Sequence, residues 1–241
     1  MRFKSLVSAV AIASLGAGLS VSAAAEDEFT ISGNVTLATD YVFRGQSQTD
    51  EEAAIQGGFD MEFGGFYLGT WASNVDFGTD AQAEIDYYGG YNFGITEDLS
   101  LDVGYIYYSY AGESDLNYNE LKAAIGWRDL TVGVNYSWDY LGKDPFGEGD
   151  VDFYYWFADY SFALPADFSL GLHVALNSAD GSNNNIAFEE DPENEYTEWN
   201  VSLGKSLFGV DFALTYWGTT IDEDDNKLGD DRVVFSVSKS L

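Results

Sequence analysis

Apolar and polar side chains alternate in twelve separate stretches of this chain, and this pattern limits its fold more than any other feature. Successive side chains of a β-strand point to opposite faces, so each stretch has one apolar and one polar face. The clearest case is residues 130–140, where Leu130, Val132 and Val134 alternate with small or polar residues. The twelve expected strands cover residues 30–44, 53–63, 66–74, 82–93, 99–108, 118–127, 130–140, 151–162, 168–177, 196–205, 210–218 and 232–239.

The first of these stretches, residues 30–44, is long enough to cross a bilayer, since a tilted strand needs about 9–11 residues. Unpaired backbone groups in lipid cost several kcal/mol each, so strands that cross hydrocarbon must close into a ring. On one face of this stretch lie Ile31, Val35, Leu37, Tyr41 and Phe43. The pattern therefore predicts a closed barrel rather than an open sheet.

The connections between the expected strands alternate strictly in length. The short ones are residues 64–65, 94–98, 128–129, 163–167 and 206–209; the long, acidic ones are residues 45–52, 75–81, 109–117, 141–150, 178–195 and 219–231. Outer-membrane barrels show this asymmetry, with short periplasmic turns and longer extracellular loops. We therefore predict an all-β, antiparallel transmembrane β-barrel of twelve strands. A soluble β-sandwich also alternates, but its turns need not alternate in length.

The first 25 residues look like a targeting segment. Arg2 and Lys4 precede an apolar run over residues 6–19, and Ala23 and Ala25 fit an A-x-A cleavage site before Glu26. We expect residues 1–25 to be removed as a signal peptide, leaving 241 − 25 = 216 residues, enough for one domain over residues 26–241. The rest of the chain has no apolar run long enough for a transmembrane helix and no cysteine.

Acidic residues outnumber basic ones by 41 to 10, for a formal net charge of −31. This balance argues against nucleic acid as a partner and favours cations. An acid that faces lipid costs free energy, and eleven of the twelve expected strand acids fall on the polar faces, with Asp152 at a rim. This sorting indicates a wet interior. The acids expected to line a pore are Asp40, Asp60, Glu62, Glu84, Asp86, Asp102, Glu120, Asp139, Asp159, Glu198 and Asp211. The bases on the same faces are Arg44, Lys122, His173 and Arg232.

Aromatic residues cluster near the expected strand ends, where the two interfacial girdles of a membrane barrel would lie. The loop-end girdle is expected to hold Tyr41, Phe43, Tyr105, Tyr107, Trp138, Tyr140, Trp199 and Tyr216. The turn-end girdle is expected to hold Phe63, Tyr91, Phe93, Trp127, Tyr160 and Phe162.

Twelve tilted strands enclose a barrel with a backbone radius of roughly 12 Å, between the filled eight-stranded and the open sixteen-stranded kinds. One hypothesis is a narrow, cation-preferring channel for passive diffusion of small solutes. The alternative is that Arg44, Lys122 and Arg232 pair with nearby acids and plug the lumen of a structural barrel. An adhesive barrel that acts through its acidic loops is a further alternative.

Catalysis and metal binding find little support in the sequence. His173 is the only histidine, and Ser169 and Asn177 lie four residues along the same strand, about 13 Å away and too far for a nucleophile–base pair. Asp222 and Asp224 begin like an EF-hand loop, but Lys227 stands where glycine is needed. We therefore expect no enzyme activity, no catalytic residue, no metal site and no cofactor.

Four segments resemble the TorF-type porins, also known as Gcw_chp outer-membrane proteins. The opening segment is residues 39–49 (TDYVFRGQSQT); the others are residues 69–75, 84–91 and 102–105, together with Asn119 and Glu120. The resemblance runs over nearly the whole chain after residue 25 and implies a porin of a Gram-negative outer membrane, with no defined substrate. One departure is Leu241 at the end of the chain, where such barrels commonly carry an aromatic residue.

These inferences define the expected surroundings of the protein. They are the lipids of the bacterial cell outer membrane, small solutes with cations preferred, and the barrel-assembly machinery acting through the C-terminal strand. The sequence carries no pattern that sets the oligomeric state.

Overall fold

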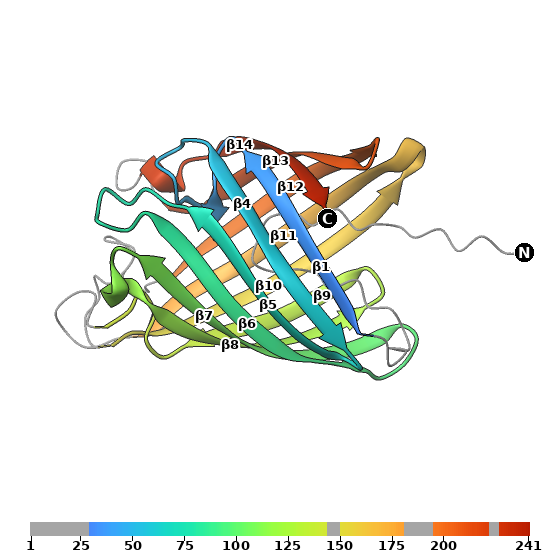
Figure 1. Ribbon diagram of the computed structural model, residues 1–241, viewed down its shortest axis with the longest axis horizontal. Coiled ribbons are helices and arrows are strands. Elements are labelled where there is room, and N and C mark those ends of the chain that lie inside the picture. Colours follow the sequence, from blue (N-terminus) through green and yellow to red (C-terminus); the bar gives the residue numbers. More distant parts are fainter. Residues whose placement is uncertain (1–28, 144–149, 181–194, 222–226) are drawn as a thin grey trace, which may run out of the picture.

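The structure, a computed structural model, describes residues 29–143, 150–180, 195–221 and 227–241 (Figure 1). The expected signal peptide and parts of three expected loops lie outside these residues. In the described part of the chain, no helix is both long and apolar enough to cross a membrane.

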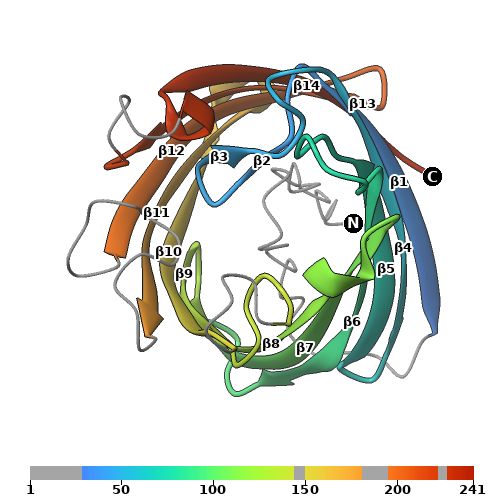
Figure 2. The ribbon, with the colours of Figure 1, turned by 90° about the vertical axis from the view of Figure 1, so that its left-hand side faces the viewer.

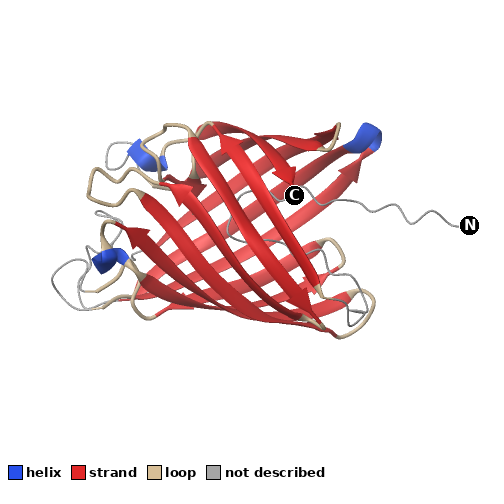
Figure 3. Cartoon of the chain, in the orientation of Figure 1, coloured by secondary structure: helices blue, strands red, loops and turns tan. Residues whose placement is uncertain are grey.

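Twelve antiparallel strands close into one barrel, as the alternation predicted (Figures 1 and 3). They are β1 (Thr30–Ala38), β4 (Ala54–Phe63), β5 (Phe66–Asn74), β6 (Ala83–Gly94), β7 (Leu99–Ala111), β8 (Tyr118–Trp127), β9 (Leu130–Ser137), β10 (Asp152–Leu164), β11 (Phe168–Asp180), β12 (Glu195–Leu207), β13 (Val210–Thr219) and β14 (Arg232–Ser240). Each strand pairs with its neighbours in sequence, and β1 pairs with β14 from Asn34↔Ser240 to Ala38↔Ser236.

The two faces of the barrel wall differ as the alternation requires. Outward-facing Ile31 and Ile55 are 66% and 65% exposed, whereas inward-facing Glu84 and Glu120 are fully buried. A soluble protein places its apolar residues inside, so this barrel is inverted relative to that rule. Among the expected girdle residues, Tyr105, Trp138 and Tyr216 at one end and Trp127 and Phe162 at the other are exposed on the outer surface.

The connections place both described ends of the chain on the side of the short turns. Five connections are short, for example the turn between β4 and β5 at Gly64 and Gly65, where both glycines have positive φ. We call this side the turn end and the opposite side, with the longer connections, the loop end. Short 3-10 helices lie in one short turn (Pro165–Asp167) and in two long connections (Ser114–Leu116 and Lys227–Gly229).

The first expected strand is too long by six residues. The strand ends at Ala38 instead of Arg44, and residues 39–49 fold back as a small hairpin of β2 (Val42–Phe43) and β3 (Gln46–Ser47). The chain turns over Arg44 and Gly45, which both have positive φ. Viewed from the loop end, this hairpin lies inside the ring of strands (Figure 2). We call residues 39–49 the inner hairpin.

Three expected girdle residues therefore lie inside the barrel. Tyr41 and Phe43 belong to the inner hairpin, and Tyr41 is 3% exposed. Tyr140 lies beyond the end of β9, which stops at Ser137, and its ring stacks on Phe153 at 3.9 Å between centroids. In each case the alternation continues past the strand end, so the sequence pattern did not show where the chain turns inward.

Candidate functional site

The inner hairpin is fastened to the barrel wall through Asp40 at its base. The Asp40 carboxylate accepts hydrogen bonds from Ser47 (2.7 Å) and Thr49 (2.9 Å) within the hairpin. It also pairs with Arg232 of β14 at 2.9 Å. Arg232 further donates to the carbonyl oxygen of Leu228 at 2.6 Å. These contacts hold the start of the hairpin against β14, although Asp40 and Arg232 are 192 residues apart.

Arg44, at the tip of the inner hairpin, forms a buried ion pair with Glu120 of β8. The Nη2 atom of Arg44 lies 2.5 Å from Oε1 of Glu120, and both side chains are almost fully buried. Burial lowers the pKa of the Arg44 guanidinium, but Glu120 and neighbouring tyrosines outweigh this and hold the pKa well above its ordinary value. The guanidinium is therefore a permanent charge inside the barrel.

The second oxygen of Glu120 is held by the barrel wall. It accepts hydrogen bonds from the hydroxyl of Tyr108 (3.1 Å) and the Nδ2 atom of Asn135 (3.0 Å). A buried carboxylate is tolerated only when it is paired and hydrogen-bonded, and this one is both. The carbonyl oxygen of Arg44 accepts a further bond from the hydroxyl of Tyr196, at 2.8 Å.

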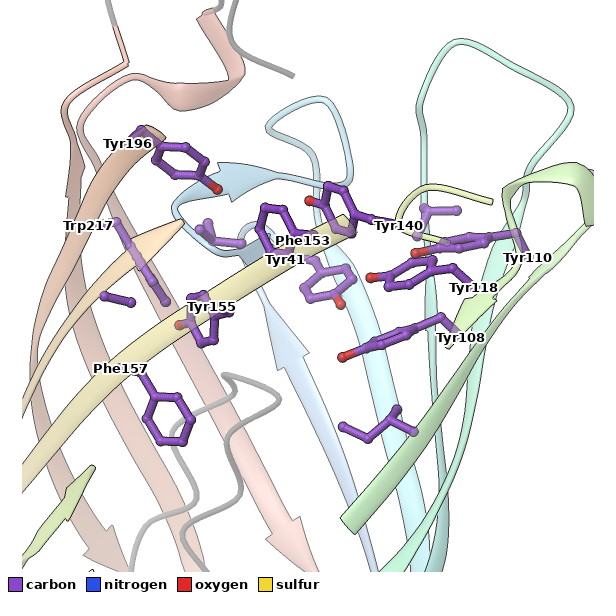
Figure 4. Packing of buried hydrophobic residues seen from close by; sticks show 14 of the residues in the cluster. Tyr41, Tyr108, Tyr110, Tyr118, Tyr140, Phe153, Tyr155, Phe157, Tyr196 and Trp217 are labelled. Carbon is purple, nitrogen blue, oxygen red and sulfur yellow. The ribbon is translucent and has the colours of Figure 1, made fainter. Parts of the chain in front are cut away.

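Aromatic rings fill much of the loop end of the lumen around the inner hairpin (Figure 4). Tyr108 and Tyr118 stack at 4.3 Å between centroids, and Tyr140 packs edge-on to Tyr118 at 5.4 Å. Tyr41 contacts Trp71 of β5 at 5.2 Å and donates to Glu84 at 3.2 Å. Burial raises the pKa of the Tyr41 phenol, and the nearby Glu84 raises it further, so Tyr41 remains a donor.

Two further groups of buried ionisable residues lie on opposite walls. On β6, Glu84 and Asp86 are both fully buried and face the same side of the strand. On the wall of β10 to β12, His173 joins two acids: Nδ1 lies 2.7 Å from Asp159 and Nε2 lies 3.2 Å from Glu198.

The hydroxyl of Tyr155 completes the second group. It donates to Glu198 at 2.8 Å and lies 3.0 Å from Nε2 of His173. Ser169 and Asn177, which share the inward face of β11 with His173, are not among the hydrogen-bond partners of His173 in the described part of the chain.

The turn end of the lumen is more open and also acidic. Asp60 accepts a hydrogen bond from Tyr88 at 2.5 Å and is partly exposed. Asp102 lies 3.4 Å from Lys122, and the Lys122 side chain is 15% exposed. Glu62 is exposed at the rim of this end. Asp211 also lies there, partly exposed, and accepts a bond from Ser206.

The fifteen residues expected to line a pore therefore occupy different places. Asp40 and Arg44 lie on the inner hairpin instead of a wall strand. Asp139 lies beyond the end of β9, at the loop-end rim. Its carboxylate accepts hydrogen bonds from the backbone nitrogen (2.9 Å) and the side-chain nitrogen (2.5 Å) of Asn119, whose side chain has the outward register. The other twelve lie on the inward register of the wall strands.

Sequence reasoning did not single out Asn135 and Tyr140 as residues of the site. Alternation places Asn135 and Tyr155 on the inward faces of β9 and β10, but no local signal connects either of them with Arg44. In the described residues, no group of three or more side chains is arranged to hold a metal ion.

The inner hairpin leaves two small cavities beside it. One is lined by residues that include Arg44, Lys122 and Asn135, and the other by residues that include Asp40 and Gln56. Each offers about 20 Å³ to the centre of a water molecule. A single water needs roughly 10–15 Å³ of such space, so each cavity admits about one water at a time.

The closed twelve-stranded wall, the apolar exterior and the polar, constricted interior define a barrel with the architecture of porins. In line with this, the chain is similar to the solved KdgM porin, with a TM-score of 0.54, 13% identity, and 87% of this chain and 99% of that chain covered. It is also similar to the NanC porin, with a TM-score of 0.53, 10% identity, and 87% and 98% covered. At these identities the likeness shows the fold alone.

A family model matches residues 22–241, and the chain thus belongs to the Gcw_chp family, described as a bacterial protein of unknown function. The match confirms the Gcw_chp resemblance, whereas the TorF-type designation stays a prediction. A comparison with curated proteins gives no match.

Proposed function

We propose that the protein is a porin of the bacterial outer membrane that gives small solutes, cations preferentially, a narrow path of passive diffusion. The observation that carries the proposal is the combination of an apolar outer surface with an interior in which carboxylates outnumber cationic groups. Around the inner hairpin, six carboxyl groups face two guanidinium groups and one imidazole. These residues are Asp40, Glu84, Asp86, Glu120, Asp159, Glu198, Arg44, Arg232 and His173.

An excess of fixed negative charge in a narrow lumen attracts cations and repels anions. We infer that the inner hairpin sets the narrowest level, because it lies inside the ring of strands and lines two small cavities there. Small, largely dehydrated ions and small polar solutes fit such a path better than large ones.

Planar bilayers containing the purified full-length protein, under a potassium chloride gradient, test this proposal. We expect small conductance steps and a reversal potential on the cation-selective side of zero. Absence of steps from both the wild type and a variant whose inner hairpin is replaced by a short glycine–serine link contradicts it.

A second candidate function is a structural or adhesive barrel that conducts nothing. The dense filling of the loop end favours it, since Glu84, Asp86, Glu120 and Glu198 are all fully buried there. Planar-bilayer recordings distinguish the two candidates, because the structural barrel predicts no conductance steps from the wild type. It also predicts that any cell-surface adhesion persists in barrels whose lumen is sealed.

A further inference from the structure

The surroundings of the Arg44 guanidinium have the composition of a receptor for a flat organic cation. The guanidinium carbon lies 4.4 Å from the ring centroid of Tyr155, 4.9 Å from that of Phe153 and 5.8 Å from that of Tyr140. A cation within about 6 Å of a ring face is attracted by the ring quadrupole, and more strongly where water is excluded. The ring of Phe43, in the inner hairpin itself, lies 4.7 Å away, and the buried carboxylate of Glu120 pairs with the guanidinium.

Apart from Phe43, the groups around the guanidinium belong to the wall strands or to the connection after β9. We call them the cage: Tyr108, Glu120, Asn135, Tyr140, Phe153 and Tyr155. Tyr108 and Asn135 hold one oxygen of Glu120, and Tyr140 and Phe153 stack on each other at an interplanar angle of 9°. Most of the cage is thus held by contacts among its own members, whereas Tyr155 is held by Glu198 and His173.

Arg44 uses only part of what the cage offers. It reaches Glu120 through one nitrogen, while its Nε and Nη1 atoms are buried with no hydrogen-bond partner in the described part of the chain. The Oδ1 atom of Asn135 is likewise buried without a partner there. Both residues line the same cavity of about 20 Å³. A guanidinium freed from the hairpin backbone can turn to satisfy more of these groups.

We propose that the cage is a binding site for guanidinium-bearing solutes and that Arg44 is its tethered occupant, which such a solute displaces. A guanidinium fits better than an ammonium or a metal ion because it is planar, weakly hydrated and able to donate in several in-plane directions while its faces meet rings. The tether keeps Arg44 at a high effective concentration, so the wild type binds free guanidinium weakly. Binding at the cage does not depend on whether the barrel conducts.

Ethylguanidinium is the natural probe, because it is the fragment that the Arg44→Ala substitution removes from the side chain. We expect isothermal titration calorimetry of the Arg44→Ala barrel in detergent micelles to show saturable binding of ethylguanidinium. The affinity should be at least about tenfold higher than that of the wild type, equivalent to about 1.4 kcal/mol. Ethylammonium, with the same charge but no planar fork, should bind clearly more weakly.

The double variant Arg44→Ala/Glu120→Gln is the matched control and should lose the binding, because the carboxylate is gone while the rings stay. Equal affinity of the wild type and Arg44→Ala for ethylguanidinium overturns the proposal. So does equal binding of ethylguanidinium and ethylammonium, because a non-specific acidic lumen predicts that result.

If Arg44→Ala does not fold alone, refolding it with millimolar ethylguanidinium provides the readout. Recovery of the folded barrel with ethylguanidinium, and not with ethylammonium, supports the cage as its site. No recovery with either compound overturns it. Both readouts are independent of conductance, so a silent bilayer recording contradicts the porin proposal and leaves this one standing.

Discussion

The loop end and the turn end of the lumen have the same strands and the same inward alternation, yet they differ in how their charges are held. At the loop end, Glu84, Glu120 and Glu198 are fully buried among aromatic rings. At the turn end, Asp60 and Lys122 keep part of their surface in contact with solvent. The difference comes from one segment, because the inner hairpin enters only the loop end (Figure 2). In a barrel with a given number of strands, the lumen can thus be filled at one depth and open at another.

The largest expected effect of this difference is on stability. Glu120→Gln leaves the Arg44 guanidinium buried without its carboxylate, so we expect a loss of about 3–5 kcal/mol in the free energy of unfolding. Asp60→Asn, its match at the turn end, removes one hydrogen-bonded carboxylate near water and should cost about 1 kcal/mol. Urea unfolding in lipid vesicles, followed by tryptophan fluorescence, compares them. Equal losses would show that the two ends hold their charges alike.

The next effect concerns conductance. Replacement of residues 41–48 by a short glycine–serine link should raise single-channel conductance several-fold, because it removes the segment that narrows the loop end. Asp60→Asn, at the more open turn end, should change conductance little. Planar-bilayer recordings of the two variants provide the measurement, and a larger effect of Asp60→Asn would place the narrowest level at the turn end instead.

Ion selectivity offers a finer distinction. In a potassium chloride gradient, Lys122→Gln should shift the reversal potential toward stronger cation preference, and Asp102→Asn should shift it the opposite way, because each changes the fixed charge of the lumen by one unit. The two residues form one ion pair, so their shifts should be of similar size. Shifts of the same sign would mean that these side chains do not face the ion path.

The smallest effect is expected outside the lumen, where the short turn between β6 and β7 meets the one between β8 and β9. Arg128 and Asp98 pair at 3.2 Å, but their side chains are 61% and 55% exposed. Asp98→Asn should therefore change the free energy of unfolding by less than about 1 kcal/mol. The same urea titration measures this change. A loss of unfolding free energy as large as that of Glu120→Gln would show that burial does not explain why the charges at the loop end contribute more to stability.

The fold was largely predictable from the sequence because alternation is a local property. A few residues of each wall strand are enough to show which side chains face lipid and which face the lumen. The lengths of the connections indicate which strand ends lie on the same side of the barrel. Strand ends were less predictable: Tyr41 and Tyr140 continue the alternation of the preceding strands, although the chain has already turned inward.

The candidate site was less predictable for a different reason. Its contacts join residues far apart in the sequence, such as Asp40 with Arg232 and Arg44 with Glu120. Polarity indicated that these side chains face inward, but no local pattern states which acid meets which base. The cage joins residues of β7, β8, β9, β10 and the connection after β9, which no local pattern connects with one another.

The junction of the first and last strands has a mechanical consequence. β1 and β14 pair at five positions, against thirteen for β10 and β11. Two further backbone–backbone hydrogen bonds, and one from the Phe235 nitrogen to the Thr39 hydroxyl, extend the contact at its two ends. A hydroxyl bond between Thr36 and Ser238 adds to it at 2.7 Å. The contact between β1 and β14 has the fewest paired positions of any two neighbouring wall strands, so we expect these two strands to separate more easily than the others. A chain that inserts as a curved sheet would therefore close its barrel at this contact last.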